Sequence, residues 1–135
     1  MNDAQIKKIL AESKVIAVVG CSRDPEKEAY KVPAYLQAHG YKIIPVNPFA
    51  DKILGKKTAK SLAEVKEAVD LVDVFRPSAD CLAVAQDALK MVQKPKVFWM
   101  QLGIRNEATR KLLEANGVAV VEDRCTKAEH ARLMK

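Results

Sequence analysis

The feature that most constrains the fold of this chain is a run of five apolar residues, VIAVV at positions 15–19, which leads directly into Gly20 and a polar turn. A short, mostly β-branched run of this kind predicts a fully buried strand. Because the glycine after it has no side chain, the backbone of the next loop can approach a ligand closely. A helical segment at 30–39 follows and is closed by Gly40. Strand, glycine-containing loop and helix form the opening unit of α/β folds that bind nucleotides, with the phosphate at the loop and the helix N-terminus.

The rest of the chain alternates between strand and helix patterns. Further strands are predicted at 42–46, 71–75, 96–100 and 118–121, and helices at 3–13, from Ser61, after Pro77-Ser78 to about Val92, at 106–116 and from Thr126. Ser61 and Thr126 are each followed three residues later by a glutamate, which is the pattern of a capping box at a helix start. Residues 49–60 are polar and predicted to be irregular. The alternation predicts one α/β domain over residues 1–135, a Rossmann-type, doubly wound parallel sheet of about five strands.

The composition limits the kinds of partner. The formal net charge of +6 fits a lysine-rich surface and also an anionic small ligand. Nucleic acid is not expected, because the basic residues are spread along the chain, aromatic residues make up only 5% and no recognition motif occurs. No apolar run approaches the roughly 18 residues that span a bilayer, and no apolar signal segment opens the chain, so no membrane contact and a cytoplasmic location are predicted. Cys21, Cys81 and Cys125 form no CxxC pair, so neither a disulfide framework nor a metal site is expected.

The carboxyl ends of the predicted strands supply the candidate site, because the ligand of a parallel α/β sheet lies beyond those ends. In chain order these positions hold Gly20, Cys21 and Ser22, then Asn47 and Pro48, then Arg76 and Pro77, then Gln101 and Gly103. Glycine, asparagine and proline are common in any loop, so most of these could be turn residues only. Arg76 and Gln101 are not preferred turn residues, yet each directly follows a buried strand, which favours a binding role.

Several familiar nucleotide-binding motifs are absent. The fingerprint GxGxxG does not occur, and the second strand ends in Asn47, where an NAD site usually has Asp or Glu for the ribose hydroxyl. Both departures argue against a dehydrogenase. The lack of GxxxxGK[ST] excludes a P-loop NTPase, and no acidic cluster ends the first strand as it does in a receiver domain.

Several short motifs follow one another along the chain: Val18-Val19-Gly20-Cys21-Ser22, Pro25 with Lys27, Tyr30-x-Val32-x-x-Tyr35-Leu36, Gly40-Tyr41, Pro45-Val46-Asn47-Pro48, Ser61-Leu62, Val69-Asp70-x-Val72-Asp73-Val74-Phe75-Arg76, Trp99-x-Gln101-x-Gly103 and Val120-Val121-x-Asp123-Arg124-Cys125. With these motifs in this order, the chain resembles the small, stand-alone CoA-binding-domain proteins, which are related to the N-terminal CoA-binding domain of succinyl-CoA ligase α-subunits. The motifs span nearly the whole chain, and their order and spacing together are specific. The chain departs from the pattern at Cys21, where alanine is common, at Ala29, where serine is common, and at Pro33.

The resemblance implies that the chain binds coenzyme A or an acyl-CoA, with the pyrophosphate against the loop from Gly20 to Pro25. The residue chemistry agrees with this placement. The Ser22 hydroxyl can donate a hydrogen bond, and the backbone amides of Gly20 and Cys21 can point at phosphate oxygens.

Cations are expected near this ligand, because coenzyme A carries three phosphates. Arg23, Lys27 and Arg76 are the candidates by position, and the guanidinium fork of Arg76 suits phosphate best. Arg76 could instead pair with Asp73 or Asp123 and only hold the sheet edge together. The dipeptide Asn47-Pro48 would meet the adenosine half, where an acidic residue would repel a phosphorylated ribose.

Three functions stay open on the sequence. The sequence favours a CoA-binding module without chemistry of its own, because it contains no readable Ser-His-Asp or Cys-His arrangement and no catalytic residue can be named. The alternatives are an enzyme that uses CoA thioesters together with a partner, and an oxidoreductase that uses NAD(P) or a flavin. Cys21 keeps enzyme chemistry open, since a thiol between a strand and a helix can have a lowered pKa, although it can also be a small buried residue in place of alanine. A protein partner and a homo-oligomer are both open.

Overall fold

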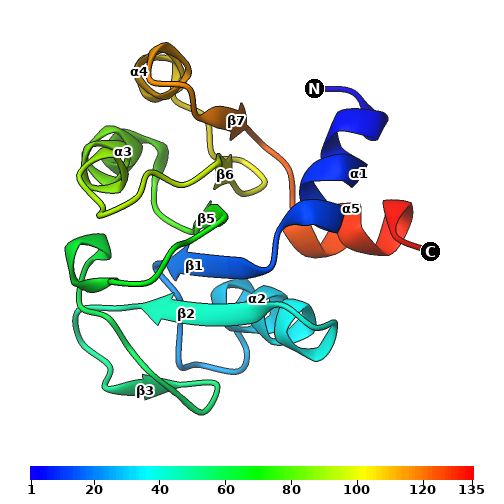
Figure 1. Ribbon diagram of the computed structural model, residues 1–135. Helices are drawn as coiled ribbons and strands as arrows, with labels where there is room; N and C mark the ends of the chain where they lie inside the picture. Colours follow the sequence, from blue (N-terminus) through cyan, green and yellow to red (C-terminus); the bar gives the residue numbers. More distant parts are fainter.

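The predicted strands pair into one parallel sheet. The computed structural model of the chain describes residues 1–135. Its main sheet has the order β2-β1-β5-β6-β7, and every neighbouring pair is parallel. The strands are β1 (Val15–Val19), β2 (Lys42–Val46), β5 (Leu71–Val74), β6 (Val97–Met100) and β7 (Ala119–Val121). The α/β class and the doubly wound sheet are therefore confirmed (Figure 1).

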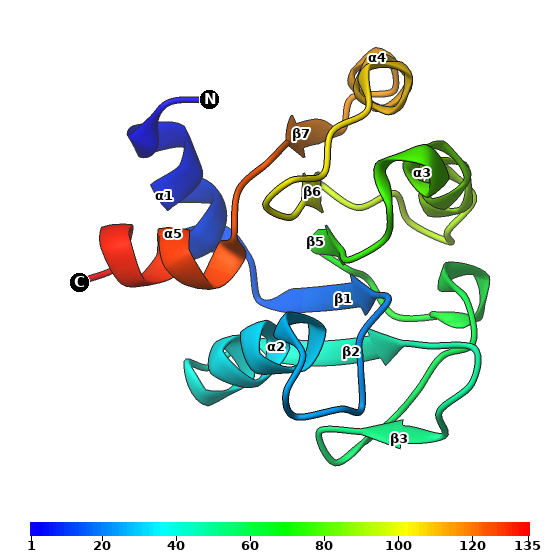
Figure 2. The ribbon, with the colours of Figure 1, turned by 180° about the vertical axis from the view of Figure 1, so that it is seen from behind.

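Helices cover both faces of this sheet (Figures 1 and 2). One face carries α1 (Asp3–Glu12), α2 (Glu28–Ala38) and α5 (Thr126–Leu133), and the other carries α3 (Cys81–Leu89) and α4 (Glu107–Ala115). Along β1, Ile16 and Val18 are buried under the first group, whereas Ala17 and Val19 are buried under the second. Burial on both sides explains why the strands read as continuous apolar runs. No helix combines the length and the apolar character that a membrane crossing requires.

The order of the strands reverses between β1 and β5. The chain runs from β1 through α2 to β2 on one side, then returns past β1 to start β5 on the other. In open α/β sheets the crevice at such a switch point, outside the carboxyl ends of the strands, is where ligands bind. Gly20 follows β1 at this point, and its N–H donates to the Val46 carbonyl at 3.1 Å, so the prediction that this amide points at a phosphate is wrong. The Phe75 N–H donates to the Val19 carbonyl at 2.9 Å, so three strand ends are joined here.

Residues 49–60, predicted to be irregular, contain a short antiparallel hairpin of β3 (Lys52–Ile53) and β4 (Lys56–Lys57). Its two turn residues both have positive φ, 54° at Leu54 and 74° at Gly55. That is the backbone of a type I′ turn, which Asn-Gly or Asp-Gly usually form. Leucine rarely takes this conformation, so the sequence pattern does not reveal the hairpin.

The two predicted capping boxes are wrong. The segment after Ser61 forms only a single 3-10 turn, η1 (Leu62–Glu64), and the Ser61 side chain accepts no cap hydrogen bond. At the second position Cys125, not Thr126, is the N-cap of α5. The Thr126 hydroxyl points into the core instead and donates to Asp73. The Thr126 hydroxyl therefore binds the buried carboxylate of Asp73 rather than capping the helix as the local pattern predicts.

The helix after Pro77-Ser78 begins and ends differently from the prediction. Its first residues form a separate 3-10 turn, η2 (Ser78–Asp80), and α3 ends at Leu89 rather than near Val92. Of the apolar residues that suggested a longer helix, Met91 packs into the core from outside the helix, whereas Val92 is 81% exposed.

Candidate functional site

A hollow with a volume of about 300 Å³ opens at the carboxyl ends of β1 and β2, beside the switch point. Its wall includes Gly20, Pro48 and Arg76, so predicted site residues from three strand ends meet here. Phe49, whose residue surface is 90% exposed, and Lys60 complete its outer side. The volume lies at the lower end of the range of small-molecule sites.

Gly20 is fixed by its own neighbours at the floor of this hollow. Its φ is +82°, in the left-handed region that favours glycine. A β-carbon at this position would lie only 2.6 Å from the Phe75 carbonyl oxygen and 3.3 Å from Cδ of Arg76. The sequence predicts a close approach of the backbone to a ligand at Gly20. In the structure the close approach is between the ends of β1 and β5.

The loop after Gly20 is ordered by its own hydrogen bonds. Oγ of Ser22 accepts from the Asp24 N–H at 3.0 Å, and the Ser22 N–H donates to the Ala29 carbonyl at 3.0 Å. The Ser22 hydroxyl hydrogen stays available to a phosphate oxygen, because this oxygen acts only as an acceptor within the loop. Arg23, Pro25 and Lys27 are exposed along the same loop.

Asn47 joins the first loop to the second. Its Nδ2 donates to the Cys21 carbonyl at 2.8 Å, and its Oδ1 accepts from the N–H groups of Phe49 and Ala50 at 2.7 and 2.9 Å. An aspartate here could accept both bonds but could not donate to Cys21. The bond to Cys21 therefore explains why this chain has an asparagine where an NAD site usually has a carboxylate.

Arg76 pairs with a residue that the sequence did not suggest. Its guanidinium donates to Oδ2 of Asp80 at 2.9 Å, across one turn of chain, and both side chains are about half exposed. The predicted partners are wrong, because Asp73 is buried and Asp123 pairs with Arg105 at 2.7 Å. One bond to Asp80 uses one of five guanidinium hydrogens, so Arg76 can still donate to a ligand in the hollow.

Gln101 and Gly103 lie apart from the hollow and are held by other contacts. Nε2 of Gln101, which is 3% exposed, donates to Oδ1 of Asp73 at 2.5 Å and to Oγ1 of Thr126 at 2.8 Å. The Gly103 N–H donates to Oδ1 of Asp123 at 2.6 Å. Both amide hydrogens of Gln101 and the N–H of Gly103 are thus used within the protein, and neither residue lines the hollow. Pro77, the last of the predicted strand-end residues, precedes η2.

The buried network around Gln101 also explains the chemistry of Cys21. Burial raises the pKa of Asp73 to about 7, although Gln101 and Thr126 both donate to its carboxylate. Burial together with the nearby Asp73 raises the pKa of Cys21 to about 12. The interpretation of Cys21 as an activated thiol is therefore wrong, and its side chain is the small buried residue that replaces alanine.

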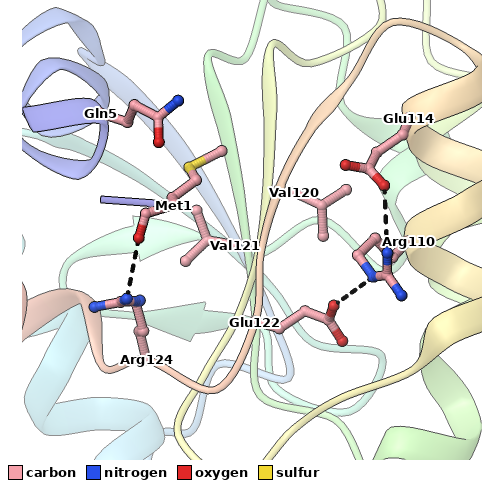
Figure 3. A pocket seen from close by; sticks show the side chains of 8 residues that line it. All are labelled: Met1, Gln5, Arg110, Glu114, Val120, Val121, Glu122 and Arg124. Carbon is pink, nitrogen blue, oxygen red and sulfur yellow. Dashed lines mark hydrogen bonds and ion pairs between the residues drawn. The ribbon is translucent and has the colours of Figure 1, made fainter. Parts of the chain in front are cut away.

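A larger hollow, of about 460 Å³, lies at the other end of the sheet over the edge of β7 (Figure 3). Its charged groups already have partners. Arg110 binds Glu122 at 2.9 Å and lies 3.7 Å from Glu114, while Arg124 donates to the Met1 carbonyl at 3.2 Å. Two arginines face two glutamates there and no predicted site residue is present, so this hollow suits an anionic ligand less well.

Comparison with known proteins shows the family of the chain and supports its fold. Residues 14–131 match the family model described as a CoA binding domain. "Uncharacterized protein YneT" of Bacillus subtilis (strain 168) is 43% identical over 128 residues, which cover 95% of this chain and 93% of that protein. The solved structure of cell-free ID.343 from Thermus thermophilus is similar with a TM-score of 0.93 at 40% identity, and the match covers 98% of this chain and 99% of that chain.

A weaker likeness extends to much longer proteins. The acetate–CoA ligase (ADP-forming) of Methanocaldococcus jannaschii is 32% identical over 71 residues, which are 53% of this chain but only 10% of the ligase. The likeness therefore concerns a small part of that enzyme.

Proposed function

Because the chain belongs to the CoA-binding domain family, we propose that it binds coenzyme A or an acyl-CoA at the carboxyl edge of its sheet, as a binding module without catalytic residues of its own. The observation that carries this proposal is the hollow at the switch point, where Gly20, Pro48 and Arg76 come together from three strand ends. It is the position at which doubly wound sheets bind nucleotides.

The proposed pose follows the polar groups of the site. The pyrophosphate lies against the loop from Gly20 to Pro25, where the Ser22 hydroxyl donates to it and the exposed Arg23 and Lys27 supply positive charge. Arg76 donates from the β5 side. The adenosine half lies at the end of β2, where the exposed ring of Phe49 offers a face on which a base can stack.

The proposal of a binding module rests on the state of two thiols near the site, those of Cys21 and Cys81. Sγ of Cys81 donates to the Pro77 carbonyl at 3.6 Å, and burial raises the pKa of this thiol to about 11. Cys21 is fully buried and its pKa is raised to about 12, so it holds its proton at neutral pH and is no nucleophile. No other predicted site residue is a nucleophile paired with a base. The oxidoreductase alternative is tested by the same binding experiment that tests the proposal.

Coenzyme A and acetyl-CoA are expected to bind at least about tenfold more tightly than NAD, a difference of roughly 1.4 kcal/mol. Titration calorimetry of the purified protein measures this difference. The affinity for coenzyme A should fall as salt rises, because part of the attraction joins phosphates to exposed cations. Equal or tighter binding of NAD would overturn the proposal in favour of an oxidoreductase.

Replacing Arg76 with alanine is expected to weaken coenzyme A binding by roughly 1.5–3 kcal/mol, the scale of hydrogen bonds to a charged group. The fold should be little affected, because the ion pair with Asp80 is half exposed and such pairs contribute about 0–1 kcal/mol. Titration calorimetry and thermal unfolding separate the two effects.

The matched control for Arg76 is Asp80→Asn, which removes the charge of the same ion pair and leaves the guanidinium free. Its affinity for coenzyme A should equal or exceed that of the unmodified protein. If Arg76→Ala instead lowers the melting temperature and leaves the affinity intact, Arg76 only holds the edge together and does not belong to the site.

A further inference from the structure

Two lysines face each other across the β3–β4 hairpin. Lys52 and Lys57 are direct cross-strand partners in the antiparallel register, and both are exposed. Like charges opposite one another destabilise a strand pair. Neither lysine forms an ion pair that would offset this repulsion. The hairpin therefore carries an electrostatic cost that a bound anion would relieve.

These two lysines line a hollow of about 440 Å³ together with Asp51, Thr58 and Lys60. Three lysines face one carboxylate there, and that carboxylate is bound to Nζ of Lys60 at 3.2 Å. No apolar side chain lines this hollow. Its lining is that of a site for a small, multiply charged anion, in which lysines act as point charges.

The hairpin is firmly attached to the sheet. Ile53 is 2% exposed, and the Thr58 hydroxyl donates to the Ala50 carbonyl. The Ala59 N–H donates to the Pro45 carbonyl, and the Ala59 carbonyl accepts from the Asn47 N–H, both at 2.9 Å. The backbone that carries the lysines is thus hydrogen-bonded to β2 and its following loop, which lowers the entropy lost when they bind an anion.

The lysine hollow adjoins the hollow at the switch point, because Lys60 lines both. The ribose of a nucleotide bound to a Rossmann-type sheet lies near the end of the second strand, and positive side chains there accept a ribose phosphate where the nucleotide has one. The hairpin begins six residues after β2 ends at Val46. The lysines at this hollow are therefore placed to bind a phosphate attached to the ribose of a nucleotide at the switch point.

We propose that Lys52, Lys57 and Lys60, the lysine cluster, bind a phosphate monoester, and that in the nucleotide bound here this group is the ribose phosphate of coenzyme A. The inference rests on the proposed function and adds the part of the ligand that selects coenzyme A over nucleotides with an unmodified ribose. Dephospho-CoA lacks only this phosphate, so it is the probe that isolates the contribution of the cluster.

Titration calorimetry with the two ligands tests the proposal. Coenzyme A should bind at least about tenfold more tightly than dephospho-CoA to the unmodified protein, the scale of a hydrogen-bonded contact between charged groups. In Lys52→Gln/Lys57→Gln, where only Lys60 of the cluster remains, the affinity for coenzyme A should fall most of the way to that for dephospho-CoA, whose own affinity stays unchanged. The melting temperature of the free variant should not fall, because a repulsive pair has been removed.

The matched control is Lys7→Gln/Lys8→Gln, which makes the same change of charge on exposed residues of α1, far from the hairpin (Figures 1 and 2). It should keep the preference for coenzyme A. Equal binding of both ligands to the unmodified protein, or an unchanged preference in Lys52→Gln/Lys57→Gln, would overturn the role of the cluster and leave the proposed function standing. If neither ligand binds at all, the proposed function is wrong and this inference fails with it.

Discussion

Replacing Gly20 with alanine should weaken coenzyme A binding at least about tenfold and destabilise the fold by roughly 2–5 kcal/mol, the sum of a left-handed backbone penalty and overpacking. The new β-carbon would meet a backbone oxygen, that of Phe75, at 2.6 Å. A backbone atom inside a paired sheet cannot turn away, so β1 and β5 must separate at their carboxyl ends. The loop that is proposed to hold the pyrophosphate would move with Gly20. Thermal unfolding and titration calorimetry measure the two losses.

Gly117→Ala is the matched control for this substitution. Gly117 has a φ of +78°, close to the +82° of Gly20, but a β-carbon there would have no atom within 4 Å. This variant should lose only the backbone penalty of about 1–2 kcal/mol and keep its affinity for coenzyme A. If the two alanine variants are destabilised equally, the contact with the Phe75 oxygen does not contribute to the destabilisation, and the expected overpacking at Gly20 is wrong.

The parts of the fold that could be predicted are those whose signals lie within a few neighbouring residues. A strand buried on both faces is a continuous apolar run, and VIAVV and VFWM each form such a strand in the sheet. Because the five strands of the main sheet are parallel, their carboxyl ends lie at one edge, and residues that follow β1, β2 and β5 do meet in the hollow. A local pattern together with a rule of topology was sufficient there.

The parts that could not be predicted depend on contacts between distant positions. Gln101 was placed in the site because it follows a strand, but its amide is held by Asp73 and Thr126, 28 and 25 positions away. A single aspartate inside the apolar strand LVDV was the available signal, since a fully buried carboxyl needs donors. The lysine pair of the hairpin was hidden because its turn places Leu54 at a positive φ that leucine rarely adopts.

The free energy of unfolding should fall as the pH rises from the pKa of Asp73 in the unfolded chain to its higher pKa in the native protein. Its carboxyl is fully buried, and burial raises its pKa to about 7 from the ordinary value of 3.8. Between these values the unfolded chain has lost this proton and the native chain has kept it. The native state then binds more protons than the unfolded state, so the contribution falls by about 1.4 kcal/mol per pH unit and by roughly 4 kcal/mol in all. It is fully present below pH 3.8 and lost by pH 7.

Two variants isolate this group from the other titrating carboxylates when urea unfolding is measured from pH 4 to pH 8. Asp73→Asn keeps a carbonyl oxygen for Gln101 but carries no titrating proton, so its free energy of unfolding should lack the fall that the unmodified protein shows. Thr126→Val removes a hydrogen bond that stabilises the carboxylate, so in that variant the fall should continue to a higher pH. If the free energy of unfolding changes with pH in parallel in Asp73→Asn and the unmodified protein, Asp73 is already ionised in the native core. In that case Gln101 and Thr126 would stabilise a buried charge, and the network would tie β5, β6 and α5 together through a carboxylate rather than through a neutral acid.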